Sequence, residues 1–302
     1  MNSIVRPALL ISRSLAQNLL HLYDYPHPQK PGVLIPGYDK PHALRTAKMC
    51  AAVALAFRHS LSLVRQYQIA CLLHDLGRYG LDPPLFGRIW SWARRQGIPT
   101  RPAEWRAVHP DTPYGKETEA FLARYRASLE ASGIPMDQWA CEQVEMRLGF
   151  ARRLRRRLRE VRPILRQLGV SWAPWMQHIM LYYYYPEVLQ NAPAWVRQFG
   201  EILVGCEQLE AYSNRRRGRD YYARPYECFA EAFTYLKRLY ETGILGHAVL
   251  TTIQFLAAQG VFDRILAAAR GEKCLSPSDQ QFLRTLLPSV DSPCLLSATT
   301  SP

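Results

Sequence analysis

Apolar residues recur every three or four positions along most of this chain, and that spacing predicts amphipathic helices. The segments that show it are 4–23, 40–59, 63–76, 117–132, 136–168, 174–185, 193–213, 225–242, 248–269 and 277–287. Runs with a period of two are absent, and β-branched residues are sparse. Proline and glycine cluster at the breaks between segments, where turns are expected. The pattern predicts an all-α fold, a bundle of many helices.

The same pattern suggests one main domain with an addition at its C-terminal end. Residues 1–242 can form one helical bundle. Residues 243–288 add a short helical extension, which we expect to pack on the bundle because so short a piece cannot bury a core of its own. Residues 289–302 are rich in serine, threonine and proline, so they are expected to be a disordered tail.

Composition narrows the class of protein. The chain has 302 residues and is 48% hydrophobic, enough for one large domain or two modest ones. No apolar run reaches the roughly eighteen residues that a transmembrane helix needs. The first residues are typical of an amphipathic helix and not of a signal peptide, so a soluble, cytoplasmic protein is expected. The seven cysteines are scattered and never spaced C-x-x-C, which predicts reduced, buried thiols.

The net charge of +13 favours phosphate-bearing partners. Much of the excess lies in 147–166 and 215–219. Between Arg152 and Arg159 six arginines alternate with leucines, the pattern of an amphipathic basic helix. Three interpretations stay open for this helix: a solvated face balanced by acidic surface elsewhere, a surface for phosphate or nucleic acid, and a surface for an anionic membrane or a partner protein.

The predicted helix 63–76 ends in two strong metal ligands, His74 and Asp75, and a glycine follows where a helix end favours it. Imidazole and carboxylate together suit Mn, Fe, Mg or Zn. His42 lies near the start of the preceding predicted helix, 40–59. If the two helices are antiparallel, the end of the second lies beside the start of the first, which would bring His74 and Asp75 close to His42. The alternative is that His74 caps a helix, Asp75 pairs with Arg78, and His42 is an ordinary surface histidine.

Four motifs in one order resemble a known superfamily. The pattern H-x-x-R-x-A at 42–47 and A-x-L-L-H-D-L-G-R at 70–78 resemble the HD-domain metal-dependent phosphohydrolases, most closely their HD-GYP branch. The segment 104–115, with His109-Pro110, is similar to the branch's H-P-E-x-G motif. The segment 201–213, with Glu207, is similar to a helix that carries an aspartate ligand in the branch. The resemblance covers roughly residues 39–237.

The resemblance implies an HD-type multi-helix bundle. The basic helical segment at about 117–170 is longer than the resemblance leads one to expect, so we interpret it as an insertion into that bundle. It implies that His42, His74, Asp75 and Glu207 hold a divalent ion, and that His109 binds a second one. It further implies hydrolysis of a nucleotide or cyclic-dinucleotide-like phosphoester, in which a metal-bound hydroxide attacks phosphorus. Within that reaction Asp75 and Arg78 would be the catalytic residues.

The chain also departs from the branch. Where the branch has two histidines, residues 182–185 are all tyrosine, and phenols bind most divalent ions poorly at neutral pH. One metal site is therefore expected and a second is doubtful. An alternative is that His178, four residues before Tyr182 on the same helical face, replaces one of the missing histidine ligands. Arg78 replaces a lysine, and we expect it to bind the substrate phosphate together with Arg216 and Arg219. The alternative function is a catalytically degenerate HD-fold module for nucleotide sensing or signalling; the oligomeric state is not indicated.

Overall fold

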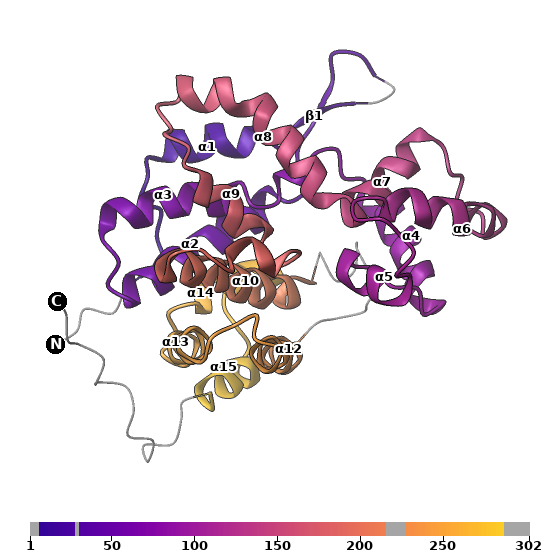
Figure 1. Cartoon of the computed structure of the whole chain (residues 1–302). Coiled ribbons are helices and arrows are strands. Elements are labelled where there is room, and N and C mark those ends of the chain that lie inside the picture. Colours follow the sequence, from indigo (N-terminus) through magenta and orange to yellow (C-terminus); the bar gives the residue numbers. More distant parts are fainter. Residues whose placement is uncertain (1–5, 28–29, 216–227, 287–302) are drawn as a thin grey trace.

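The computed structural model describes residues 6–27, 30–215 and 228–286. Of these residues 67% are helical, which confirms the predicted all-α multi-helix bundle (Figure 1). The described strands are β1 (Tyr25–Pro26) and β2 (Leu34–Ile35), a short antiparallel pair in which Tyr25 lies opposite Ile35. Within the described part of the chain no helix is both long and apolar enough to cross a bilayer.

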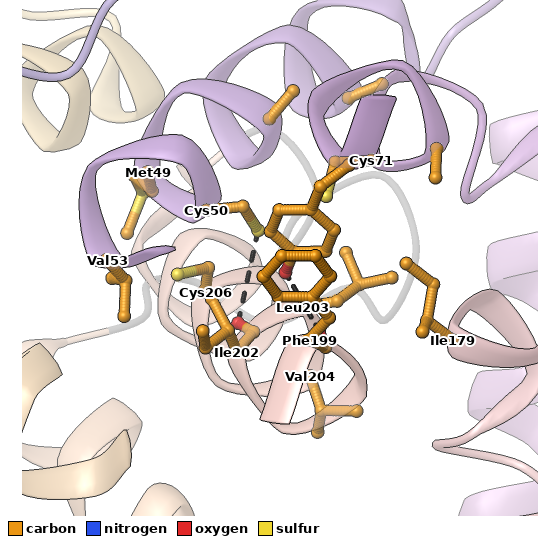
Figure 2. Packing of buried hydrophobic residues seen from close by; sticks show 14 of the residues in the cluster. Met49, Cys50, Val53, Cys71, Ile179, Phe199, Ile202, Leu203, Val204 and Cys206 are labelled. Carbon is orange, nitrogen blue, oxygen red and sulfur yellow. Dashed lines mark hydrogen bonds between the residues drawn. The ribbon is translucent and has the colours of Figure 1, made fainter. Parts of the chain in front are cut away.

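Three helices form the centre of the bundle: α2 (Lys40–Ala56), α3 (Leu61–Leu72) and α10 (Ala194–Ser213). Five buried alanines on α2 let its neighbours approach closely, and α2 packs against both α3 and α10. Cys50, Cys71 and Cys206, one from each helix, meet in the apolar interior between them (Figure 2). Tyr67 of α3 stacks on Phe199 of α10 and donates its hydroxyl hydrogen to the Phe199 carbonyl at 2.9 Å.

The main hydrophobic core runs from the first described helix to the last. The other elements that share it are α1 (Arg13–His21), α8 (Phe150–Gln167), α9 (Pro174–Leu181), η2 (Pro186–Leu189), α12 (Phe229–Glu241), α13 (His247–Ala258), α14 (Asp263–Arg270) and α15 (Pro277–Arg284). Helices α13 and α14 lie against α2 and α10, so the C-terminal segment buries its apolar face on the centre of the bundle. The predicted tail 289–302 lies outside the described residues.

A second hydrophobic core lies beside the first and is built from residues 81–148. Its helices are α4 (Pro83–Arg95), α5 (Pro102–Val108), α6 (Glu117–Ala131) and α7 (Gln138–Leu148), which group together in Figure 1. Trp90, Trp105 and Phe121 fill its centre. This grouping begins earlier than the expected insertion at 117–170 and ends before the basic helix α8, whose apolar face joins the main core instead.

Two further details differ from the sequence pattern. Helices α4 and α5 were not predicted, because the Asp-Pro-Pro at 82–84 reads as a break, whereas Asp82 caps α4 by accepting a hydrogen bond from the Leu85 N–H at 3.1 Å. The single helix expected over 136–168 is two helices, α7 and α8, that meet at Gly149. A side chain at Gly149 would collide with the carboxylate of Glu145, which is held in place by Arg152.

Candidate metal centre

The turn after α3 brings the histidine–aspartate doublet to the start of α2. Helix α3 ends at Leu72, and His74 and Asp75 lie in the turn before the short 3-10 helix η1 (Leu76–Arg78). His42 lies in the first turn of α2. The Nε2 atoms of His42 and His74 are 3.2 Å apart, and Asp75 Oδ2 lies 3.6 Å from the first and 3.8 Å from the second. All three side chains are buried.

These separations fit a small cation. Ligand atoms at about 2.1 Å from a divalent ion are about 3.0 Å apart in an octahedron and about 3.4 Å apart in a tetrahedron. The three distances between His42, His74 and Asp75 are close to that range, so small side-chain shifts bring the three atoms to one ion. The spatial arrangement that the sequence motifs required is therefore present.

Glu207 approaches the same point from α10. His42, His74 and Glu207 each offer a ligand atom, and these atoms lie within 4.8 Å of one another. The two imidazoles therefore have a carboxylate from the η1 turn, Asp75, and a second carboxylate from α10, Glu207, beside them. Glutamate stands where the resemblance leads one to expect aspartate, and its longer side chain still reaches the two imidazoles.

Hydrogen bonds at the far side of each imidazole point both Nε2 lone pairs inward. Glu210, which is fully buried, contacts His42 Nδ1, and a carboxylate can only accept, so Nδ1 carries the hydrogen. The Cys71 carbonyl oxygen lies 2.7 Å from His74 Nδ1 and can only accept a hydrogen bond, so this Nδ1 carries the hydrogen too. In the neutral rings two lone pairs therefore face each other across 3.2 Å, an arrangement that a cation between them stabilises.

Glu210 is a candidate site residue that sequence reasoning missed. It lies one turn after Glu207 on α10, and besides His42 it accepts hydrogen bonds from Arg45 Nε at 2.6 Å and from Asn214 Nδ2 at 3.2 Å. The sequence contained a pattern that could have identified it. Glu207 and Glu210 are three residues apart on an apolar helix, and this spacing places both carboxylates on one face of the helix.

Arg78 belongs to the same cluster through Asp75. Its Nε lies 3.4 Å from Asp75 Oδ1, and its Nη2 donates a hydrogen bond to the Tyr184 hydroxyl at 3.3 Å. Burial raises the pKa of Tyr184; the positive charge of Arg78 acts the other way, and the carboxylates of Glu207 and Asp75 add to the increase. The phenol therefore stays protonated beside the cluster, and Arg78 places positive charge against Asp75.

The remaining candidates are not part of this group of ligands. His109 ends α5 with its ring packed on Trp105, 4.3 Å between ring centres, and it is not one of the three clustered ligands. His178 is exposed on α9. Arg216 and Arg219 lie outside the described residues. The tyrosine run is mostly structural: the Tyr183 hydroxyl, for example, lies 2.6 Å from that of Tyr235.

No protein-family model, no curated protein and no solved structure matches this chain. We therefore infer a function from the geometry of these side chains and from the motifs that supply them.

Proposed function

We propose that this chain is a metal-dependent phosphohydrolase of the HD type, which acts on a phosphoester of the nucleotide class. His42, His74, Asp75 and Glu207 would hold one divalent ion. The observation that carries the proposal is the pair of buried Nε2 atoms that face each other at 3.2 Å with Asp75 beside them. The order of the four motifs along the chain, which resembles that superfamily, supports it.

A divalent ion at this position supplies two things: it lowers the pKa of a bound water molecule, and it offsets negative charge on a phosphate. The protein supplies the rest. Glu210 and the Cys71 carbonyl hold the two imidazoles in the ligating tautomer. Arg78 orients Asp75 and offers a guanidinium whose planar fork matches phosphate oxygens. Burial of the cluster excludes bulk water, which strengthens each of these electrostatic interactions.

The second candidate is an HD-type module that binds a nucleotide or scaffolds a signalling complex without turnover. The tyrosines favour it, because Tyr183 and Tyr184 occupy the segment where further ligands were expected and contact Tyr235 and Arg78 instead. A single ion offers a phosphate less charge stabilisation than a pair of ions does.

Metal analysis of the purified protein tests the site. We expect about one divalent ion per chain in the wild type and none in the His74→Ala/Asp75→Ala double variant. His247→Ala is the matched control, since His247 is exposed at the start of α13 and contacts Tyr240. Circular dichroism of each variant establishes that it is folded. An equal metal content in all three proteins contradicts the proposed site.

Turnover is tested with the same three proteins. The panel contains cyclic dinucleotides, nucleoside monophosphates and triphosphates, and a chromogenic phosphodiester, each with Mn or Fe supplied. We expect hydrolysis by the wild type and by His247→Ala, and loss of it in the double variant. Equal rates in wild type and double variant contradict catalysis at this site. Stoichiometric metal with no hydrolysis of any compound supports the non-catalytic module.

A further inference from the structure

A cavity of about 680 Å³ lies between η1 and the helices α7 and α8, beside β1. This volume is within the range of about 300–1,000 Å³ typical of small-molecule sites. The Leu76 and Gly77 residues of η1 line it, whereas Asp75 and Arg78 of the same turn belong to the metal cluster. None of the proposed metal ligands lines the cavity, so it is a second, separate site.

One face of each helix is turned toward this cavity. On α7 the lining residues recur at four-residue steps, and on α8 at three- and four-residue steps, which is the spacing of neighbours on a helix surface. They are Gln138, Glu142 and Met146 on α7, where Trp139 lines the cavity as well, and Arg153, Arg156, Arg157 and Glu160 on α8. The cavity is thus formed by the packing of α7 and α8 against the η1 turn, and it uses the basic helix that the sequence singled out.

Three aromatic side chains form part of the cavity wall. The ring centre of Tyr25 lies 5.8 Å from that of Tyr79 and 6.1 Å from that of Trp139. Tyr25 is buried, and its hydroxyl donates to the Leu81 carbonyl at 3.0 Å. Tyr79 and Trp139 are half-buried, so part of each ring remains accessible. One face of Tyr79 is covered by the Arg157 guanidinium, so the accessible part of Trp139 is the aromatic surface that can accept a planar ring by stacking.

The three arginines of the cavity have different roles. Arg153 is buried and holds the turn, since it donates to the Gly77 carbonyl at 2.9 Å and to the Tyr79 carbonyl at 2.7 Å. Arg157 lies 3.7 Å above the Tyr79 ring and pairs with Glu160 at 2.9 Å. Arg156 is exposed at the cavity, and across the described ranges no ion pair or hydrogen bond engages it. Its guanidinium is the charge that remains for an anionic ligand.

We propose that this cavity binds a nucleoside monophosphate, with the base packed against Trp139 and the phosphate held by Arg156. The aromatic wall matches a planar base, the arginine fork matches phosphate oxygens, and the volume accommodates a ligand of this size. The proposal does not depend on the metal site, because no residue is shared between the two.

Isothermal titration of the full-length protein with AMP, GMP, CMP and UMP tests it. We expect at least one of the four to bind the wild type, and Arg156→Ala to weaken that binding at least about tenfold, the loss of a charge-assisted contact. Arg155→Ala is the matched control: this neighbouring arginine is also exposed but does not line the cavity. We expect it to bind as the wild type does. Inorganic phosphate and the free nucleoside should each bind at least about tenfold more weakly than the nucleotide.

Binding is measured again after removal of divalent ions with a chelator and in the His74→Ala/Asp75→Ala variant, and no change is expected in either. Since Arg156 makes no described contact, Arg156→Ala leaves the fold intact, and thermal melting verifies this. The proposal is overturned if none of the four nucleotides binds, if Arg155→Ala weakens binding as much as Arg156→Ala, if inorganic phosphate binds equally well, or if binding is lost with the metal or the doublet.

Discussion

Replacing Glu210 by alanine removes the carboxylate that holds His42 and Arg45 in the interior of the bundle. Glu210 is fully buried, and Arg45 Nε lies 2.6 Å from its Oε1 with only 16% of the arginine side chain exposed. Breaking a buried ion pair by removing one partner typically costs about 3–5 kcal/mol, because the other charge is left without compensation. We therefore expect Glu210→Ala to lower the free energy of unfolding by about that amount.

Glu210→Gln separates stability from metal binding. The amide keeps the shape of the side chain and a hydrogen-bond acceptor for His42 Nδ1, but it removes the negative charge that makes the imidazole a stronger ligand. Loss of such a partner behind a ligating histidine weakens metal affinity by about 10–100-fold. We expect the affinity of this variant for a divalent ion to fall within that range, with a smaller loss of stability than in Glu210→Ala.

Urea unfolding followed by circular dichroism measures the stability, and competition with a chromophoric chelator measures the affinity. Glu241→Gln is the control, because its pair with Lys237 is exposed and 3.9 Å long. Such a surface change stays within about 0.5 kcal/mol and leaves the affinity unchanged. If Glu210→Gln bound metal as tightly as the wild type, the claim that the negative charge of Glu210 strengthens His42 as a metal ligand would be refuted.

Three other predictions follow from the packing around the site. In Gly77→Ala the new Cβ would lie 2.7 Å from the Phe150 ring, so we expect the free energy of unfolding to fall by about 1–3 kcal/mol. Thermal melting measures this change, and an unchanged melting temperature would mean that the ring moves aside freely. Burial, and to a lesser extent the charge of Asp82, raises the pKa of Tyr25 from 10.0 to about 12. Between these pH values the unfolded chain releases the Tyr25 proton and the folded protein keeps it, so the stability of the fold falls as the pH rises. Tyr25→Phe should flatten that decline in urea titrations, and an identical slope contradicts the assignment. An aromatic disulfide reagent should modify the exposed Cys274 in the native protein but the three buried thiols of Figure 2 only upon unfolding, and fast reaction of all of them argues against the packing.

Much of the candidate site was predictable because its chemistry is encoded locally. His74 and Asp75 are adjacent, and the end of a helix fixes their relation to each other. His42 follows from simple topology, since a short connection between α2 and α3 returns the chain to its starting end. Glu207 was identified only through the resemblance of its helix to a known motif, and the structure places it within 4.8 Å of both imidazoles.

Glu210 and the cavity at η1 were not predictable in the same way. Glu210 and His42 are 168 residues apart in sequence, and they become partners only when α10 packs on α2. The basic helix α8 left three interpretations open, because its sequence gives the periodicity of its arginines but not what lies opposite them. In the structure Arg153 is engaged with the η1 turn, Arg157 with Tyr79, and Arg156 faces the cavity.

By itself the sequence determined the class of fold and the ligand types, because helix periodicity, turn residues and adjacent metal ligands are properties of short segments. Tertiary structure decided which helices meet and where the second core begins. It also decided that the His109 ring packs on Trp105, and which charges remain for a ligand. The physical reason is that burial and pairing depend on contacts between distant segments, and a side chain acquires its role from the neighbours that exclude water around it.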